Sequence, residues 1–218
     1  MEIISLAKQC LVVGCGSHAS SVISVLESVD YEIVGLVDTS KVFDPEEEKS
    51  GYKVISTLEI VLKNQAKYKH FACFVAIGDN ITRKLVFDQL VFAGFSLPNA
   101  ISKYAVVDRT VEMGGGNIVF HNAIINANSI LGNNNIVNSG VIIEHDCVIK
   151  DHSHLAPRSV LCGGGIISSL VFLGASSTVI PSITISESIT VGAGAVVIKS
   201  TSKIGSSLIG VPAKEYRQ

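Results

Sequence analysis

Aliphatic residues recur at every sixth position through the C-terminal half of the chain. The seventeen members of the series follow one another without a miss: Ile101, Val107, Met113, Val119, Ile125, Leu131, Val137, Ile143, Ile149, Leu155, Leu161, Ile167, Leu173, Val179, Ile185, Val191 and Val197. The position four residues after each of them is nearly always small or β-branched. A period of six fits neither an α-helix nor a long strand. It predicts short strands joined by tight corners, with one large side chain per strand pointing inward and stacked coils enclosing a continuous apolar column.

The first 98 residues follow a different pattern. Three apolar runs are typical of buried strands in a parallel sheet: residues 10–14, 32–38 and 71–78. Three further segments have helical spacing: residues 20–29, 58–68 and 81–92. This alternation predicts a small α/β domain. Because the segment 97–99 breaks both patterns, we expect an α/β domain over residues 1–98 and a solenoid over residues 99–218.

Composition narrows the classes of function. The net charge is −2 and tryptophan is absent, so neither electrostatics nor stacking favours a nucleic-acid partner. No apolar run reaches the roughly 18 residues of a membrane helix, and the N-terminal segment lacks the pattern of a signal peptide. Five scattered cysteines without a C-x-x-C pair predict reduced thiols in a cytoplasmic protein. His152 and His154 have no third ligand at a suitable spacing, so we expect no metal site.

A glycine-rich loop follows the first predicted strand. Residues 14–19 match G-x-G-x-x-A, and Asp38 follows about twenty residues later. Backbone N–H groups of such a loop can bind phosphate at the N-terminus of a helix. From the residues alone, three interpretations remain open: a site for a nucleotide-sugar diphosphate, a site for NAD, or a loop with a structural role only.

The two-part plan and several short motifs resemble the hexapeptide-repeat sugar O- and N-acyltransferases of bacterial glycan synthesis. The motifs are the glycine loop from Gly14 to His18, Ala76-Ile77-Gly78-Asp79-Asn80 with Arg83-Lys84, the block of Asn138 with Glu144-His145-Asp146-Cys147-Val148-Ile149, Ser153-His154 and Gly210-Val-Pro-Ala-Lys214. The family includes enzymes that acetylate the 4-amino group of a UDP-linked dideoxy sugar and enzymes that O-acetylate sialic acid. The resemblance implies a Rossmann-like α/β domain, a left-handed parallel β-helix with three hexads per coil, and a homotrimer with coenzyme A between adjacent solenoids.

The resemblance also assigns a nucleotide-sugar pocket. Its residues would be Gly16, Ser17, His18, Asp38, Gly78 and Asn80. One departure concerns Val37, because family members often carry an acid at that position. An alternative for His18 is an exposed place in the first turn of a helix, without a ligand.

The candidate base is His145. It follows Ile143 by two places and lies between Glu144 and Asp146, so its side chain is expected to project outward. Transfer of an acetyl group to an amine or hydroxyl needs a base, and imidazole has the most suitable ordinary pKa, which a neighbouring carboxylate raises. The resemblance makes His145 the base, Asp146 its supporting acid and Asn138 a residue that positions the substrate. A hydrogen bond across a subunit seam is the alternative role for His145.

The resemblance implies acetyl-CoA as co-substrate. The expected contacts are His154, Ile166, Gly174, Ala175, Gly192 and Ala193. The two small pairs are eighteen residues apart, which is one coil, and small residues permit a close approach of pantetheine. They could equally serve the corners of the coil. Lys199 could pair with phosphates of CoA or lie free on the surface.

The expected activity is therefore acetyl-CoA-dependent N-acetylation of a nucleotide-linked amino sugar of the UDP-4-amino-4,6-dideoxy type. O-acetylation of sialic acid or a related sugar is the first alternative. A non-catalytic solenoid that senses a nucleotide is the second, and an NAD-linked enzyme is the third. No cysteine or serine lies in an obvious nucleophile motif, so direct attack of the amine or hydroxyl on the thioester is expected.

Overall fold

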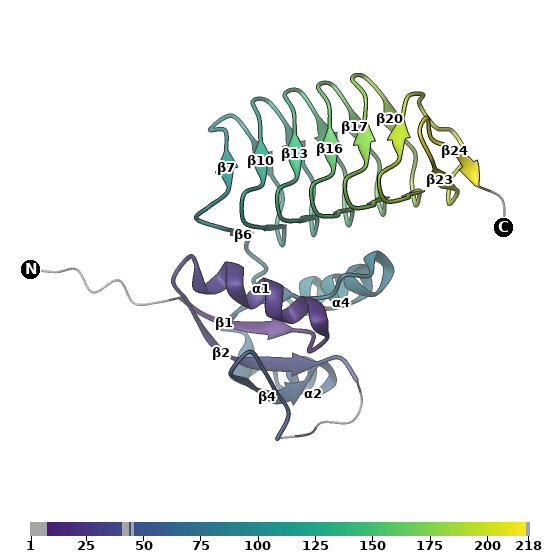
Figure 1. The fold of residues 1–218 in the computed structure, drawn as a ribbon. Helices are drawn as coiled ribbons and strands as arrows, with labels where there is room; N and C mark the ends of the chain where they lie inside the picture. The colour runs from purple at the N-terminus through teal and green to yellow at the C-terminus, as the bar shows by residue number, and fades with distance from the viewer. Residues whose placement is uncertain (1–7, 41–43, 45, 217–218) are drawn as a thin grey trace, which may run out of the picture.

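The computed structural model describes residues 8–40, 44 and 46–216, which form an α/β domain beside a long three-sided prism (Figure 1). In chain order the α/β domain contains β1 (Lys8–Val13), α1 (Ser17–Glu27), β2 (Tyr31–Asp38), β3 (Glu48–Lys49), β4 (Tyr52–Thr57), α2 (Leu58–Lys63), α3 (Gln65–Tyr68), β5 (Ala72–Val75) and α4 (Asn80–Phe92). Its sheet has the order β3-β4-β2-β1-β5. All pairs are parallel except the β3–β4 hairpin.

The two faces of this sheet are buried against different partners. Cys10 and Val12 of β1 pack with α1 on the face toward the prism, and Phe120 and Ile136 of the prism complete that apolar cluster. Leu11 and Val13 of β1 pack with α2, α3 and α4 on the opposite face. A parallel strand covered on both faces needs a continuous apolar run, which explains the pattern at residues 10–14.

The structure refines the sequence expectations at three places. The segment 58–68 is not one helix, because Asn64 leaves the helical region (φ −113°, ψ 47°) between α2 and α3. The helix expected over residues 20–29 begins at Ser17, directly after the glycine loop. The β3–β4 hairpin, for which the sequence analysis proposed no element, extends the sheet beyond β2.

The prism is built from two-residue strands at six-residue intervals. They are β6 (Ala100–Ile101), β7 (Val106–Val107), β8 (Glu112–Met113), β9 (Ile118–Val119), β10 (Ile124–Ile125), β11 (Ile130–Leu131), β12 (Ile136–Val137), β13 (Ile142–Ile143), β14 (Val148–Ile149), β15 (His154–Leu155), β16 (Val160–Leu161), β17 (Ile166–Ile167), β18 (Phe172–Leu173), β19 (Thr178–Val179), β20 (Thr184–Ile185), β21 (Thr190–Val191) and β22 (Val196–Val197). The hairpin β23 (Ser207–Ile209) and β24 (Lys214–Tyr216) follows. The second residue of each strand from β6 to β22 belongs to or packs on one apolar cluster, which confirms the six-residue register.

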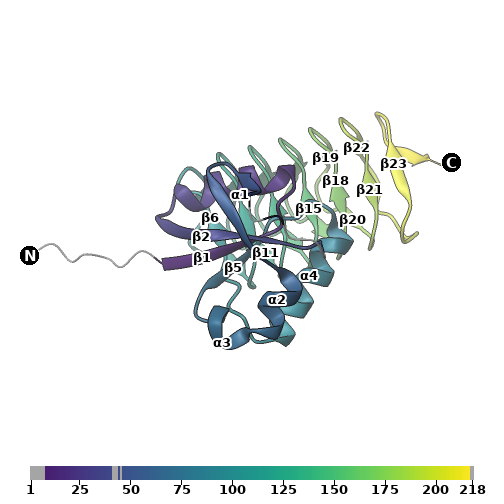
Figure 2. The same cartoon turned by 90° about the horizontal axis from the view of Figure 1, so that it is seen from below.

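Three parallel sheets form the walls, as expected for a left-handed β-helix. The first sheet contains β6, β9, β12, β15, β18 and β21, continued by β23 and β24. The second contains β7, β10, β13, β16, β19 and β22, and the third contains β8, β11, β14, β17 and β20. The α/β domain covers the early coils of the first sheet (Figure 2). Ala100, Ile118 and Ile136, at outward positions of these coils, are therefore buried.

A ladder of buried asparagines supports the corner between the third and first sheets. Asn117 is fully buried, and its Nδ2 donates to Asn99 Oδ1, Gly114 O and Gly132 O. Its Oδ1 accepts the backbone N–H of Asn135 one coil further on. A buried amide with every group satisfied is costly to remove, because its partners then lose their hydrogen bonds.

Replacing Asn117 with alanine is therefore expected to lower the free energy of unfolding by about 2–4 kcal/mol. Urea unfolding monitored by circular dichroism measures this change. Lys150→Ala, at an exposed position of the prism without a positive φ, is the control and should unfold like the wild type. An unfolding free energy of Asn117→Ala equal to the wild-type value would contradict this account of the corner.

Within the part of the chain that the structure describes, no helix combines the length and apolarity needed to cross a bilayer.

Candidate active site

The glycine loop, the end of β2 and the segment after β5 enclose one cavity of about 600 Å³. Five of the six predicted nucleotide-sugar residues line it: Gly16, Ser17, His18, Asp38 and Gly78. They come together because the carboxyl ends of adjacent parallel strands meet at one edge of the sheet. Gly16 is the N-cap of α1 and makes no side-chain cap hydrogen bond, and Ser17 and His18 of the first turn line the cavity. The first-turn N–H groups beside the cavity are therefore not used by a capping side chain.

The charges around this cavity are acidic. Asp38, Glu47 and Asp79 line it, and no lysine or arginine is among its described lining residues. Asp38 accepts the backbone N–H of Ser40 at 3.0 Å and also pairs with the hydroxyl of that serine. Hydrogen bonding by Thr82 holds the pKa of Asp79 below its usual range. Phosphate binding here would rely on backbone N–H groups rather than on basic side chains.

His18 lies deeper than the exposed alternative suggested. Burial, and secondarily the charge of Arg83, lowers its pKa to about 4. The ring lies 5.5 Å from Phe120 and 6.0 Å from His154, measured between centroids. Its buried Nε2 has no hydrogen-bond partner among the residues that the structure describes. A buried polar atom without a partner is uncommon and marks a place where a ligand or water can bind.

A second cavity, of about 470 Å³, adjoins the first and shares Gly78 and Asp79 with it. Its walls are the start of α4 and the outer face of the first sheet, and its other lining residues are Asn80, Ile81, His154, Leu170, Phe172, Ser188 and Thr190. Asn80 therefore lies beside the predicted nucleotide pocket rather than in it. The Asn80 amide donates to Leu170 O and Val171 O, both at 3.1 Å, and so fastens α4 to the prism.

His154 is 8% exposed on the wall of this second cavity. Burial and the nearby Arg83 charge lower its pKa to about 3, so the imidazole is neutral at physiological pH. Its Nδ1 is 3.2 Å from Gly78 O, and its Nε2 is 3.1 Å from Nδ2 of Asn138. Asn138, which the sequence analysis grouped with His145, thus lies with His154 instead.

His145 projects outward, as predicted. It lies at the corner between β13 and β14, where the chain passes from the second sheet to the third. Its side chain is 64% exposed. Its Nδ1 lies 2.8 Å from Asp146 Oδ2, and this hydrogen bond, with the charge of Asp146, raises the pKa of His145. Asp146 is fixed from the preceding coil, because Nδ2 of Asn128 donates to its Oδ1 at 3.1 Å.

Gly163 lies one coil after His145 in the sequence, and its Cα is next to the imidazole ring of His145. A Cβ at this position would lie 2.8 Å from both Cε1 and Nε2 of His145. The sequence contained a signal for this contact, since the coil repeats every eighteen residues and 145 and 163 differ by that number.

The chain does not bring all predicted residues together. The corner between the second and third sheets lies across the prism from the first sheet, which the α/β domain covers (Figure 1). His145 is at that corner, between β13 and β14. The predicted CoA contacts are spread over three places: His154 on the first sheet, Ile166 on the third, and Gly174, Ala175, Gly192 and Ala193 at the corner between the first and second. Ala175 and Ala193 are exposed, whereas a Cβ at Gly174 would lie 2.5 Å from the backbone N of Ala193. Gly174 is therefore required by coil stacking, whatever else it does.

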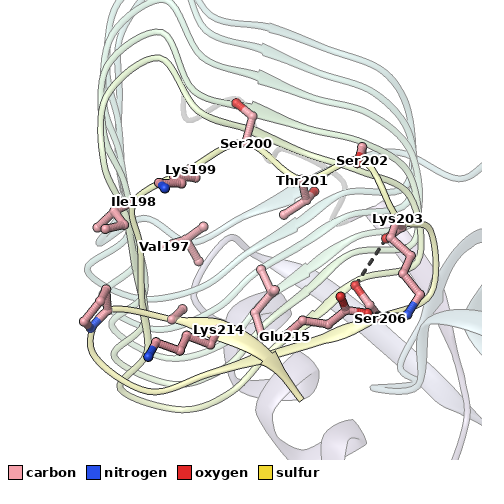
Figure 3. A pocket seen from close by; sticks show the side chains of 13 residues that line it. Val197, Ile198, Lys199, Ser200, Thr201, Ser202, Lys203, Ser206, Lys214 and Glu215 are labelled. Atoms are coloured by element: carbon pink, nitrogen blue, oxygen red, sulfur yellow. Dashed lines mark hydrogen bonds and ion pairs between the residues drawn. The ribbon is translucent and has the colours of Figure 1, made fainter. Parts of the chain in front are cut away.

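A further cavity, of about 370 Å³, lies at the C-terminal end of the prism (Figure 3). Lys199, Lys203 and Lys214 are among its lining residues, and Lys203 pairs with Glu215. Lys199, for which pairing with CoA phosphates was one of two alternatives, lines it, but none of the residues in the predicted catalytic, nucleotide-sugar or CoA contact sets does. This cavity is distinct from the two that share Gly78.

Asp146→Asn is expected to lower kcat/KM for acetyl transfer by at least about tenfold, because it removes the carboxylate that orients His145. The carboxylate stabilises the imidazolium and so raises the pKa of His145. Its loss lowers that pKa, and the acidic limb of the kcat/KM profile moves to lower pH. A pH–rate profile of both proteins measures this, and an unmoved acidic limb would contradict the role of Asp146.

Comparisons with known proteins fit both halves of the site. The profile of the family described as PglD N-terminal domain matches residues 9–90. A variant of perosamine N-acetyltransferase from Caulobacter crescentus, solved with CoA and GDP-perosamine, is 34% identical. The match covers 98% of this chain and 99% of that one, with a TM-score of 0.89.

Two further structures extend the comparison. The acetyltransferase domain of PglB from Neisseria gonorrhoeae, solved with acetyl coenzyme A, is 26% identical, with a TM-score of 0.87 over 96% of this chain and 100% of that one. WeeI from Acinetobacter baumannii is 22% identical over the same shares, with a TM-score of 0.84, and this likeness concerns the fold alone.

Proposed function

This chain belongs to the hexapeptide-repeat nucleotide-sugar acyltransferases, and we propose that it acetylates the 4-amino group of a nucleotide-linked 4-amino-4,6-dideoxy sugar. It is an acetyl-CoA-dependent acetyltransferase that acts on amino sugars in glycan biosynthesis. The observation that carries the proposal is the pair of adjoining cavities that share Gly78. One is suited to a nucleotide diphosphate at the N-terminus of α1, and the other, beside His154, has room for the sugar and the acetyl group.

The proposed mechanism is direct attack. Asp146 accepts a hydrogen bond from Nδ1–H of His145, so Nε2 of His145 keeps its lone pair and can take one proton from the neutral sugar amine as the amine attacks. The amine nitrogen forms a bond to the thioester carbonyl carbon, the carbon–sulfur bond breaks, and the CoA thiolate receives the proton from the imidazolium. The products are the N-acetyl sugar nucleotide and CoA. No residue of the chain becomes acetylated.

Because His145 lies across the prism from the cavities, we propose that it serves the cavities of a neighbouring protomer in a homotrimer. The outward positions of the two uncovered sheets support this arrangement, because several are aliphatic. They include Ile124, Ile142 and Val160 on the second sheet, and Ile130, Val148 and Ile166 on the third. Ile130 is 47% exposed and Ile166 36% exposed in the isolated chain. Large apolar side chains in columns on a surface are typical of subunit interfaces.

The oligomer is tested by mass and by complementation. Light scattering should give about three times 23.0 kDa. Chains with His145→Ala and chains with Asp38→Ala, each inactive alone, should regain about one quarter of wild-type activity when co-assembled in equal amounts, because one in four sites then receives both intact residues. A monomer, or no regained activity in co-assembled trimers, would contradict the shared site.

Ligand binding tests the proposed function without turnover. Acetyl-CoA, UDP, GDP, CMP and NAD are added separately, and the melting temperature is measured, since a ligand of the folded state stabilises it. Acetyl-CoA and UDP or GDP should raise the melting temperature. Asp38→Ala should abolish the nucleotide shift and retain the acetyl-CoA shift. A shift with NAD alone would favour a redox enzyme, and no shift with acetyl-CoA would count against any acyltransferase.

We also propose a cytoplasmic location. All five cysteines are free, as suits a reducing compartment. Burial raises the pKa of Cys10 and Cys73 to about 12, so these thiols are structural rather than reactive.

A further inference from the structure

One buried cation joins the α/β domain to the prism. Arg83, on α4, is 1% exposed and has no hydrogen bond to a carboxylate among the described residues. Its three nitrogens instead donate to neutral oxygens: Nε to Asn134 O at 3.1 Å, Nη1 to Ile77 O at 3.2 Å and Gly78 O at 3.0 Å, and Nη2 to Asn80 Oδ1 at 2.7 Å, His152 O at 2.8 Å and Ser153 O at 3.2 Å. Burial lowers its pKa to about 9, which leaves it charged at neutral pH.

The left-handed corner residues of the prism make this arrangement possible. Asn134, His152 and Leu170 follow one another at intervals of one coil, and each has a φ between 56° and 62°. Their carbonyls form a column along the prism. Arg83 donates to the carbonyls of Asn134 and His152, and Asn80 donates to that of Leu170. Several carbonyl dipoles can stabilise a guanidinium without a carboxylate, since its planar fork presents five donors.

The carbonyl of Gly78 is shared between Arg83 and His154. Nη1 of Arg83 is 3.0 Å from this oxygen, and Nδ1 of His154 is 3.2 Å from it. A carbonyl only accepts, so the proton of the neutral His154 ring must be on Nδ1. Nε2 of His154 therefore carries a lone pair.

The other side of His154 leads to the same assignment independently. The backbone N–H of Ser139 donates to Oδ1 of Asn138 at 2.8 Å, which fixes the orientation of the Asn138 amide. Nδ2 of Asn138 then faces Nε2 of His154 at 3.1 Å and donates one of its two hydrogens to it. Within the described part of the chain the second hydrogen of Nδ2 has no partner, which leaves it available to a ligand.

We propose that Arg83 is a positioning residue for acetyl transfer, which acts through Gly78 and His154 to hold the Asn138 amide in one orientation. Arg83 fixes the Gly78 carbonyl, this carbonyl fixes the tautomer of His154, and His154 accepts one hydrogen of Asn138. The free N–H of Asn138 then points at a constant place for the sugar or the thioester oxygen. This inference rests on the proposed function, and it also links the nucleotide cavity to Asn138, because Gly78 lines that cavity.

The tautomer is measured first in the unaltered protein. Long-range proton–nitrogen spectra of protein labelled with ¹⁵N-histidine distinguish the two neutral tautomers and the charged ring. His154→Gln identifies the signal. The expected result is an Nδ1–H tautomer of His154 that persists at neutral pH. An Nε2–H tautomer or a charged ring would overturn the inference, without any need for a folded Arg83 variant.

Arg83→Lys is measured next, because lysine keeps the charge but loses the fork. The expected results are a mixture of His154 tautomers and a fall in kcat of roughly tenfold to a hundredfold, as typical for a misplaced positioning group, with the nucleotide-sugar KM within about twofold. Val86→Ala is the matched control, since it destabilises the same helix through packing alone and should change neither the tautomer nor kcat.

The two proposals fail in different ways. If the unaltered protein transfers no acetyl group, the proposed function falls and the inference falls with it. If that protein is active and Arg83→Lys keeps both the single tautomer and the full kcat, the inference alone is overturned. Equal losses of kcat in Arg83→Lys and Val86→Ala would also overturn it, because stability alone would then explain the effect.

Discussion

Replacing His145 with alanine is expected to lower kcat for acetyl transfer by about 10²–10⁴-fold, the usual contribution of a positioned general base. The side chain is 64% exposed and packs into no core, so the melting temperature should stay within about 2 °C of wild type. Steady-state kinetics at saturating acetyl-CoA and thermal unfolding measure the two quantities. His70→Ala, at an exposed histidine of the α/β domain, is the matched control and should have wild-type activity.

The KM for the nucleotide sugar should change little in His145→Ala, because the proposed nucleotide site is in the α/β domain, away from His145. Higher pH should not restore the rate through this position, since alanine has no titratable group. Activity within tenfold of wild type would rule out His145 as the base.

Replacing Gly163 with alanine is expected to lower kcat roughly tenfold to a hundredfold while leaving stability nearly unchanged. The added Cβ would lie 2.8 Å from the His145 ring, which must therefore move. The displaced group is the end of an exposed side chain, so its movement costs little stability, but a shift of about 1 Å in a catalytic group costs up to 10²-fold in rate. Kinetics and thermal unfolding again measure both quantities.

A double-mutant cycle is the control for Gly163. In the His145→Ala background, Gly163→Ala should have no further effect on kcat, because its whole effect acts through the imidazole. Additive losses would show that Gly163 contributes independently, for example by direct contact with CoA, and would contradict the account of this glycine as a support.

The solenoid was predictable because its geometry leaves few alternatives. Each inward position needs an aliphatic side chain, and the series from Ile101 to Val197 marks that register in the sequence. The outward direction of His145 follows from the same alternation. The cavity at the glycine loop was equally predictable. The loop follows β1 and Asp38 ends the neighbouring parallel strand β2, so Gly16 and Asp38 meet at one edge of the sheet.

Other features depend on contacts that no local pattern encodes. The break at Asn64 divides a segment whose spacing suits one helix, and the β3–β4 hairpin adds an edge to the sheet outside the parallel pattern. Arg83 belongs to one of the motifs found in the sequence, but its contacts were not predictable. They depend on the docking of α4 against successive coils of the prism. Asn138 was grouped with His145 by resemblance, whereas its contact with His154 requires the three-dimensional structure.

The separation of His145 from the cavities is the most informative of these outcomes. In a single chain His145, the proposed base, is on one side of the prism, while Gly78 and His154 are on the other. Under the proposed function, the chain therefore needs a neighbouring protomer for catalysis and not for stability alone. A free sugar carries no nucleotide that could occupy the cavity at the glycine loop. We therefore favour N-acetylation of a nucleotide-linked sugar over O-acetylation of a free sugar.

Transfer of a labelled acetyl group, followed by mass spectrometry of the products, tests the central claim most directly. The unaltered protein is incubated with isotopically labelled acetyl-CoA and with UDP- or GDP-linked 4-amino-4,6-dideoxy sugars, with free sialic acid in parallel. We predict one labelled acetyl group on the nitrogen of a nucleotide-linked sugar and an equal amount of free CoA. Labelling of sialic acid oxygen with no product from any nucleotide-linked amino sugar would contradict the account.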